Sequence, residues 1–366
     1  MKENIAFVIY SLNSGGAERV VSTLSNGLSN KFNVTIITLI DTDPFYELNE
    51  NVNVISCGKT ATTQGNFIGS LQANFKLYIG IKEICINQSI DIIIGFMTTT
   101  NILSILVAKK LKIPVIVSER IYPAFGKLNK FWRVMRRLTY PKADTLVVQT
   151  KPILDYFNAF MKIEQLKILA NPISYALQEA KNNLQIPKEN IILNVGRLTQ
   201  QKGQEIVIKA FANLNPANWQ LHLVGDGPKK EVYSTLIKKL GMEEKIVLAG
   251  RNNQISSYYL RAKIFVFPSR FEGFPNALTE AMYMGLPCIS TDCPTGPSEL
   301  IENGINGFLT SIDDTSMFAK KMEKLIYNTE LIERMGINAA KSVLHLEETK
   351  VVKKWQKLII ETLQNS

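Results

Sequence analysis

The chain has 366 residues, a length that favours two domains of roughly 150 to 200 residues, each with an ordinary hydrophobic core. Apolar residues make up 46% of it, with 21 Gly and 14 Pro, and this composition excludes a disordered chain. The formal net charge of +10 predicts an anionic partner, such as a nucleic acid, a lipid surface or a phosphorylated small molecule.

The cysteines and the apolar runs exclude several further classes. Cys57, Cys85, Cys288 and Cys293 show no CxxC pairing and no nearby His, so neither a disulfide framework nor a zinc site is expected. The apolar run 5–10 is short and bracketed by polar residues, which favours a buried strand over a signal peptide. No stretch approaches the roughly 18 apolar residues of a membrane-spanning helix.

Short apolar runs alternate with helix-like stretches along the whole chain. Such runs, without polar alternation, are typical of parallel strands buried on both faces. Regular alternation of these strands with helices predicts two doubly wound α/β domains. The predicted strands are 4–10, 33–40, 91–96, 114–119 and 145–150 in the first half and 191–196, 219–225, 245–250, 263–268 and 287–291 in the second.

The domain boundary is expected in the stretch 171–190, which is polar, contains two prolines and has no clear period. The predicted domains are therefore 1–171 and 172–345. The last helix, near 350–364, has one apolar face and can cap either domain; about 346–366 can pack back on the first. Two such domains place a cleft at the carboxyl ends of both sheets, so the loops after the strands should carry the chemistry.

The first of these loops contains Gly15 and Gly16, where the predicted strand 4–10 turns into a helix. Two glycines let backbone N–H groups approach a ligand, and a helix N-terminus favours an anion. The spacing is not GxGxxG, so a dinucleotide fingerprint is not supported. The alternative is a tight turn that binds nothing.

The loop after strand 191–196, "GRLTQQKG", combines Gly196, Arg197 and Lys202. Arg197 leaves the strand and Lys202 is expected to open the next helix, so both cations can reach one diphosphate. The loop does not match the Walker motif GxxxxGK[ST]. The alternative is that Arg197 and Lys202 are two solvated surface cations. The loop after 245–250, "AGRNNQ" with Arg251, can present backbone groups to a flat base edge.

The stretch "SRFEGFPNALTEAM" at 269–282 sets Glu272 and Glu280 eight positions apart. Gly273 and Pro275 argue against one continuous helix, because a residue before proline avoids the α region. Glu272 is therefore expected in a loop and Glu280 one turn into a helix, with Pro275 in its first turn and Asn276 helping to cap it. The N–H groups of 274–278 then form an anion seat, an arrangement that suits a sugar nucleotide.

These motifs resemble a known family. "GRLTQQKG", followed about 70 residues later by "EGFPNALTE", resembles the retaining glycosyltransferases of family 4, whose hallmark is Glu-x7-Glu. "SLNSGGAERV" resembles the family's acceptor-side glycine-rich loop, and "STDCPTGPSELI" is similar to a subgroup that adds N-acetylgalactosamine or related hexoses to polyprenyl-diphosphate-linked glycans. The resemblance spans the chain and implies the GT-B fold, two Rossmann-like domains facing a central cleft.

The resemblance also implies roles for individual residues. Arg197 and Lys202 would neutralise the donor diphosphate, and Glu272, the third catalytic residue, would contact the donor sugar. Glu280 would hold the ribose hydroxyls, while Gly15 and Gly16 would line the acceptor side. The implied donor-binding residues are Gly196, Arg251, Gly273, Phe274, Pro275, Asn276, Ala277, Leu278 and Glu280.

One position departs from the family pattern. Several relatives carry a His after "SE" in the loop that ends the predicted strand 114–119, where this chain has Arg120. Arg cannot act as a base at ordinary pH, but it can bind an acceptor phosphate. His222 and His345 fall in a predicted strand and a late helix and are not expected to be bases. The absence of a base fits a retaining mechanism in which the departing diphosphate accepts the proton, without metal or other cofactor; a covalent intermediate on Glu272 is the minority alternative.

The segment 120–142 carries seven cations and no acidic residue. Aromatic and aliphatic residues interleave with them at helical spacing, which predicts a basic amphipathic helix lying on an anionic leaflet. The enzyme would then be peripheral on the cytoplasmic face of the plasma membrane. An ordinary packed helix with a solvated face is the alternative; no nucleic-acid fold accompanies the stripe. The cations are Arg120, Lys127, Lys130, Arg133, Arg136, Arg137 and Lys142.

Together with these residues, the resemblance therefore implies a transferase that takes a hexose or N-acetylhexosamine from a UDP-sugar and adds it to a polyprenyl-diphosphate-linked glycan. Alternatives are a sugar-nucleotide epimerase of the same fold, a transferase using another donor such as GDP-mannose, and a non-enzymatic basic binding module. Only Lys76 and Lys82 lie on the stretch 67–88, where relatives that add several sugars carry extra cations, and this favours a single addition.

Overall fold

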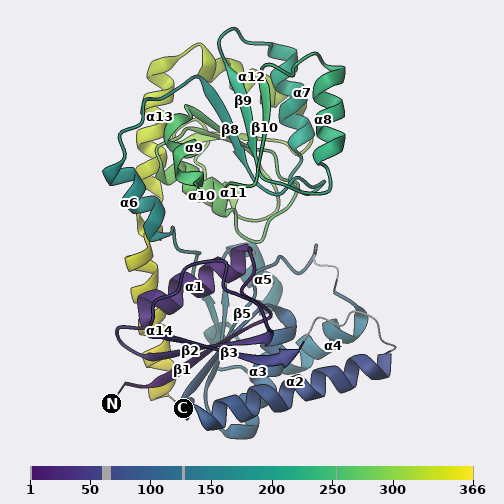
Figure 1. Cartoon of the computed structure of the whole chain (residues 1–366), viewed down its shortest axis with the longest axis vertical. Coiled ribbons are helices and arrows are strands. Elements are labelled where there is room, and N and C mark those ends of the chain that lie inside the picture. Colours follow the sequence, from purple (N-terminus) through teal and green to yellow (C-terminus); the bar gives the residue numbers. More distant parts are fainter. Residues whose placement is uncertain (1, 60–66, 126–127, 253, 366) are drawn as a thin grey trace. The chain divides into compact units, whose positions relative to one another are not determined.

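The computed structural model describes residues 2–59, 67–125, 128–252 and 254–365 (Figure 1). It divides into two compact units, one formed by Met1–Pro172 with Glu348–Ser366 and the other by Ile173–Glu347. Each unit is a parallel sheet with a helix between most successive strands, β2 and β3 being the exception, so the predicted doubly wound α/β class is confirmed.

The first unit contains a seven-stranded sheet in the order β3-β2-β1-β4-β5-β6-β7. Strand order reverses between β1 and β4, and this is the point at which open α/β sheets bind ligands. The strands are β1 Asn4–Ile9, β2 Asn33–Ile40, β3 Val52–Lys59, β4 Ile92–Phe96, β5 Val115–Ser118, β6 Thr145–Val148 and β7 Leu166–Ile168.

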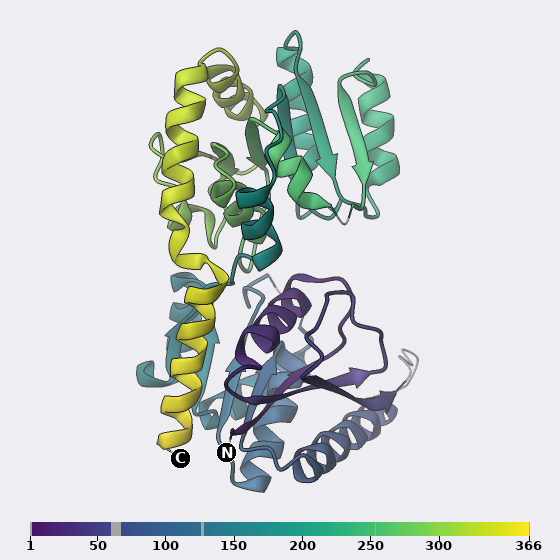
Figure 2. The ribbon, with the colours of Figure 1, turned by 60° about the vertical axis from the view of Figure 1, so that its left-hand side comes forward.

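Helices cover both faces of this sheet (Figures 1 and 2). Helices α2 Phe67–Asn87, α3 Thr98–Leu111, α4 Lys130–Thr139 and α5 Lys151–Asn158 pack on one face. Helices α1 Gly16–Leu28 and α14 Glu348–Gln364 pack on the other. Trp355 of α14 is fully buried and its ring stacks 5.9 Å from that of Phe96, so the C-terminal helix belongs to the core of the first unit.

The second unit contains a six-stranded sheet in the order β10-β9-β8-β11-β12-β13, which reverses between β8 and β11. The strands are β8 Ile191–Val195, β9 Gln220–Val224, β10 Ile246–Gly250, β11 Ile264–Phe267, β12 Cys288–Thr291 and β13 Gly307–Thr310. The helices are α6 Tyr175–Asn183, α7 Gln204–Leu214, α8 Lys230–Lys239, α9 Ile255–Arg261, α10 Asn276–Tyr283, α11 Pro297–Leu300, α12 Thr315–Ile326 and α13 Thr329–Ser342. Three short 3-10 helices complete the assignment: η1 Tyr140–Lys142, η2 Ile163–Gln165 and η3 Leu344–Leu346.

Three strands were not predicted from the sequence, and all three lie at sheet edges: β3, β7 and β13. An edge strand has a neighbour on one side only, so it need not be a continuous apolar run. The stretch 171–190, expected to be irregular, contains α6. Among the described residues, every helix is too short or too polar to cross a membrane.

Candidate active site

The loop from β8 to α7 carries two of the predicted catalytic residues. Arg197 is exposed directly after the strand, and the methylenes of Lys202 pass over Gly196. The helix begins at Gln204 and not at Lys202 as predicted, because Gly203 intervenes with φ 63°. An added Cβ at Gly203 would overlap the carbonyl oxygen of Pro268, so only glycine permits this close approach of the β8 and β11 loops.

Lys202 and Glu272 form an ion pair between these two loops. The Lys202 Nζ lies 2.6 Å from Glu272 Oε1, and the two side chains are 22% and 6% exposed. The Nζ also lies 5.4 Å from the centre of the Phe267 ring. The structure therefore joins a predicted cation and a predicted carboxylate in one partly buried pair at the carboxyl edge of the sheet.

The loop that bears Glu272 is tied to the loop that bears Lys202 by residues the sequence analysis did not select. The Arg270 N–H donates to the carbonyl of Gln201 at 2.8 Å, and the Gln201 side chain donates to the carbonyl of Phe271 at 2.8 Å. The Arg270 guanidinium is itself paired with Glu205 at 2.7 Å and with Asp313 at 2.6 Å. These bonds fix both loops, although no local sequence spacing links the residues.

The structure places Glu272 before α10 and Glu280 inside it. Glu280 is buried, and its Oε2 accepts a hydrogen bond from the Tyr259 hydroxyl of α9 at 2.9 Å. Tyr259 was not predicted; it approaches from a helix 21 positions earlier in the sequence. The hydroxyl holds one carboxylate oxygen and so restricts the rotamer of Glu280.

The predicted anion seat at 274–278 is smaller than expected. Asn276 is the first helical residue, and Pro275 occupies the N-cap position immediately before it. The N–H groups of Asn276 and Leu278 already donate to the carbonyls of Phe274 and Pro275. In the described part of the chain, no backbone carbonyl accepts from the N–H groups of Gly273, Phe274 and Ala277, so these remain the candidate donors to an anion.

Arg251 stands apart from this cluster. It follows β10 directly and is exposed. Among the described residues, no hydrogen bond or ion pair joins it to Lys202, Glu272 or Glu280. Its donor-binding role therefore stays a prediction from its place after a strand.

In the first unit, the Gly15–Gly16 turn opens α1 as predicted, with Gly15 at the N-cap position. The carboxylate of Glu18 folds back over this turn and would overlap a Cβ added at Gly15. Burial raises the pKa of Glu18. A carboxylate of the chain itself thus lies where the sequence analysis expected a seat for an external anion.

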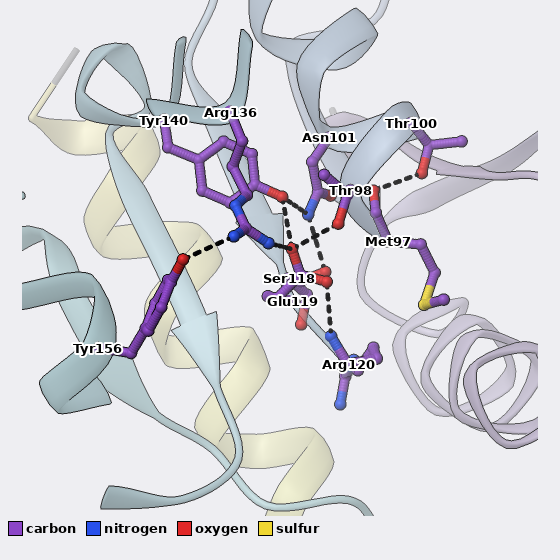
Figure 3. Close-up of polar contacts among 10 residues, drawn as sticks. All are labelled: Met97, Thr98, Thr100, Asn101, Ser118, Glu119, Arg120, Arg136, Tyr140 and Tyr156. Atoms are coloured by element: carbon purple, nitrogen blue, oxygen red, sulfur yellow. Dashed lines mark hydrogen bonds and ion pairs between the residues drawn. The ribbon is translucent and has the colours of Figure 1, made fainter. Parts of the chain in front are cut away.

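A buried polar network lies at the end of β5, centred on Glu119, which is 1% exposed (Figure 3). Its Oε2 accepts hydrogen bonds from the Thr98 and Tyr140 hydroxyls, each at 2.8 Å. The Arg136 guanidinium is 3.9 Å from the same oxygen and donates to the Tyr156 hydroxyl at 2.9 Å. Burial raises the pKa of Glu119, whereas the Arg136 charge and these hydrogen bonds oppose the rise.

The same network fixes the turn after β4. The Asn101 amide donates to the Tyr140 hydroxyl at 2.9 Å and to the Ser118 carbonyl at 3.0 Å. Met97 has a positive φ of 77°, a strained conformation for a residue with a side chain, and its carbonyl accepts from Thr100 at 2.8 Å (Figure 3). A strained residue at the point where strand order reverses marks this sheet edge as a candidate ligand site.

The position of Arg136 shows that the predicted basic helix is wrong in one respect. It was expected on the membrane-facing side of 120–142, but it is 5% exposed and engaged by Glu119. Trp132 and Met135 also pack against the core. Lys127 lies outside the described residues. The exposed face of α4 consists of Lys130, Arg133, Val134, Arg137 and Leu138.

Arg120 lies on the opposite face of the sheet from Glu119, as expected for successive residues of an extended chain. Its guanidinium lies 4.4 Å from the centre of the Phe96 ring and 6.0 Å from that of Trp355. Its Nη1 donates to the Asn171 side chain. Burial lowers the pKa of Arg120 to about 9, so the side chain is still charged at neutral pH.

Comparisons with known proteins place the chain in a family. The family described as Glycosyltransferase Family 4 matches residues 14–176, and the family described as Glycosyl transferases group 1 matches residues 177–342. A Campylobacter jejuni protein is 32% identical over 363 residues, 98% of each chain. The chain is a glycosyltransferase of this family. That relative is named GalNAc-alpha-(1->4)-GalNAc-alpha-(1->3)-diNAcBac-PP-undecaprenol alpha-1,4-N-acetyl-D-galactosaminyltransferase.

Solved structures agree with this assignment at the level of the fold. Sucrose-phosphate synthase (tll1590) from Thermosynechococcus elongatus superimposes with a TM-score of 0.84 at 18% identity, covering 100% of both chains. Anabaena Alr3699/HepE in complex with UDP superimposes with a TM-score of 0.78 at 18% identity, covering 98% of this glycosyltransferase and 100% of that chain. These structures confirm the predicted GT-B fold, the family matches and the Campylobacter relative confirm the enzyme class, and the residue roles stay predictions.

Proposed function

We propose that this glycosyltransferase transfers a hexose or N-acetylhexosamine, with N-acetylgalactosamine as the first choice, from a UDP-sugar to a polyprenyl-diphosphate-linked glycan. The observation that carries the proposal is the Lys202–Glu272 pair, 2.6 Å apart, at the carboxyl edge of the second sheet. It places a cation for a diphosphate beside a carboxylate for sugar hydroxyls. The name of the Campylobacter relative supports the acceptor class, and the UDP complex of the Anabaena protein supports the nucleotide.

The donor would be held by the loops of the second unit. Lys202 and the exposed Arg197 neutralise the diphosphate as it leaves, and Glu272 accepts hydrogen bonds from the sugar. Glu280, held by Tyr259, accepts from the ribose hydroxyls. Gly196, Arg251 and the loop 273–278 would complete the donor contacts. Transfer proceeds with retention of the anomeric configuration, and the departing diphosphate takes the proton of the acceptor hydroxyl, so neither a general base nor a metal ion is needed.

A donor screen tests this function directly. Thermal stability is measured with UDP-GalNAc, UDP-GlcNAc, UDP-Gal, UDP-Glc and GDP-mannose. We expect the largest rise in melting temperature with UDP-GalNAc, the first-choice donor. A ligand present at about 100 times its Kd stabilises the folded state by about 2.7 kcal/mol. Transfer is then assayed with an undecaprenyl-diphosphate-linked N-acetylhexosamine in the presence of EDTA, and NMR should show an α-linked product.

Each alternative function predicts a different result in the donor screen or in the transfer assay. A larger rise with GDP-mannose would replace the UDP-sugar donor. Conversion of a UDP-N-acetylhexosamine without any acceptor would identify an epimerase instead. Loss of activity in EDTA that Mg²⁺ restores would refute the metal-independent mechanism.

The acceptor would be bound by the first unit, at the membrane surface. Val134 and Leu138 of α4 are 57% and 61% exposed and lie among Lys130, Arg133 and Arg137. A helix face with exposed aliphatic residues between cations fits an anionic leaflet. We therefore propose that the enzyme is peripheral on the cytoplasmic face of the membrane that carries its acceptor.

Charge reversal tests this membrane contact. Arg133→Glu/Arg137→Glu should weaken binding to anionic vesicles by about 2 to 4 kcal/mol, since each basic charge near such a surface contributes about 1 kcal/mol. Co-sedimentation with vesicles of phosphatidylglycerol and phosphatidylcholine measures it. The matched control is Lys238→Glu/Lys239→Glu at the exposed end of α8, which should bind as the wild type does. Equal loss in both variants would show a nonspecific effect of net charge.

A further inference from the structure

The first unit contains buried polar atoms that have no hydrogen-bond partner within the described residues. Three such residues follow β5 and β6 closely: Arg120 with Nε and Nη2, Gln149 with Nε2 and Oε1, and Thr150 with Oγ1. The other unpaired atoms of this unit are on Ser22, Ser25, Asn101 and Ser104. Gln149 and Thr150 are 2% and 1% exposed. Buried polar groups are almost always paired, and each unpaired one costs about 1 to 3 kcal/mol, so this concentration points to a ligand or ordered water.

The sheet register brings these residues to neighbouring positions. Ser118 of β5 pairs with Val147 of β6, and Arg120 and Gln149 each follow two residues later. Side chains two residues apart along an extended strand share a face. Val147 packs in the same hydrophobic cluster as Phe96 and Trp355, the rings that Arg120 contacts. Both unpaired side chains are therefore expected on the α1 and α14 face of the sheet.

Thr150 lies next to this group in the sequence but on the other face of the sheet. It is the N-cap residue of α5, with extended backbone angles, φ −140° and ψ 156°, and its hydroxyl makes no capping bond. Val148, two residues earlier, packs in the hydrophobic cluster on the α5 face, so the Thr150 side chain is expected on that face and not beside Arg120 and Gln149.

The charge at this sheet edge indicates the chemistry of a ligand that would bind Arg120 and Gln149. Glu119 lies on the other face, where Arg136 is 3.9 Å from its carboxylate, and its charge also acts on Arg120 from that side. Arg120 bonds only the neutral side chain of Asn171 among the described contacts of its guanidinium, which leaves one buried positive charge without an opposite charge bonded to it. Nε and Nη2 form the edge of the guanidinium fork that matches two oxygens of one anion.

We propose that Arg120 and Gln149 form an oxyanion subsite that binds the diphosphate of the lipid-linked acceptor. The Arg120 fork would bond two phosphate oxygens, and the Gln149 amide would donate to another. This inference rests on the proposed function and adds Gln149 to the acceptor side, where it was not assigned. Inorganic pyrophosphate shares the recognised chemistry and serves as a probe independent of turnover.

Gln149→Leu separates a ligand site from an unsatisfied core residue. If Gln149 only packs, an apolar side chain of similar size removes an unpaired amide and should raise Tm without changing kinetics. If it binds the acceptor, Tm should rise or stay unchanged while the acceptor KM rises about 10-fold and the UDP-sugar KM changes less than 2-fold. Thr150→Val removes an unpaired hydroxyl on the other face of the sheet and should leave the acceptor KM unchanged.

Arg120→Lys keeps the charge but removes the planar fork, so it should raise the acceptor KM at least as much as Gln149→Leu. Ser22→Ala is the matched control, since it removes another buried and unpaired hydroxyl of this unit, on α1. We expect no kinetic change from it. Unchanged acceptor KM in both Gln149→Leu and Arg120→Lys would overturn the subsite, and an equal rise in donor KM would assign it to the donor instead.

Pyrophosphate binding tests the proposed oxyanion subsite even if no UDP-sugar supports turnover. Calorimetric titration of the wild type should show pyrophosphate binding that Gln149→Leu and Arg120→Lys weaken at least 5-fold. Lys202→Met in the same titration identifies binding at the donor loops. Retained pyrophosphate binding in the first two variants, with loss in Lys202→Met, would refute the subsite, whereas failure of the donor screen alone would refute the proposed donor.

Discussion

Replacing Lys202 by Met should lower kcat by about 10²- to 10³-fold, the usual effect of removing one charge-stabilising donor from a transition state. Met keeps the length of the apolar stem, which passes over Gly196, but it removes the cation 2.6 Å from Glu272. Under the proposed function, the leaving diphosphate then loses a partly buried positive partner. Steady-state transfer from the donor selected by the screen measures the effect.

Two further variants give this experiment its controls. Lys209→Met removes an exposed cation from α7, the helix that follows the same loop, and should leave kcat within 2-fold of the wild type. Glu272→Gln should also reduce kcat, and the double variant Lys202→Met/Glu272→Gln shows how much of the loss comes from leaving Glu272 unpaired. Activity of Lys202→Met equal to that of Lys209→Met would contradict the assignment of Lys202 to the leaving diphosphate.

Replacing Arg136 by Met should destabilise the first unit by about 3 to 5 kcal/mol, because it leaves a buried carboxylate without its cation. Arg136 lies against the Tyr156 and Phe157 rings, at 5.4 Å and 5.5 Å from their centres, so Met can fill much of the space. The cost therefore reports chiefly on charge. Chemical denaturation monitored by fluorescence at several pH values measures it.

The pH dependence of this loss has a definite sign. Burial raises the pKa of Glu119 above its ordinary value, and removal of Arg136 should raise it further. A carboxyl with a raised folded-state pKa contributes stability that is present below its unfolded pKa, about 4.3, and is lost as pH rises through the folded pKa. The difference between wild type and Arg136→Met should thus be small in acid and largest above the raised pKa.

A second variant distinguishes charge from packing. Glu119→Gln/Arg136→Met removes both charges while the Gln carbonyl can still accept from Thr98 and Tyr140, so it should recover much of the lost stability. A pH-independent loss that the double variant does not recover would mean that Arg136 acts through packing alone.

Much of the architecture and the location of the site could be predicted from local sequence. Unbroken apolar runs such as 92–96 and 264–267 marked the central strands, because a strand buried on both faces has no polar alternation. The edge strand β3 was not predicted, because only part of it is buried and its sequence is therefore not a continuous apolar run. Gly273 and Pro275 separated Glu272 from Glu280, because backbone restrictions act within a few residues.

By itself, then, the sequence determined the doubly wound α/β class and the loops that carry the candidate residues. Only the tertiary structure decided which charges meet. Lys202 pairs with Glu272 across 70 positions, and Arg136, predicted to face a membrane, turns inward to Glu119. The physical reason is range: periodicity and turn propensity arise from neighbours in the chain, whereas pairing and burial of charge depend on distances that exist only after the strands have assembled into sheets.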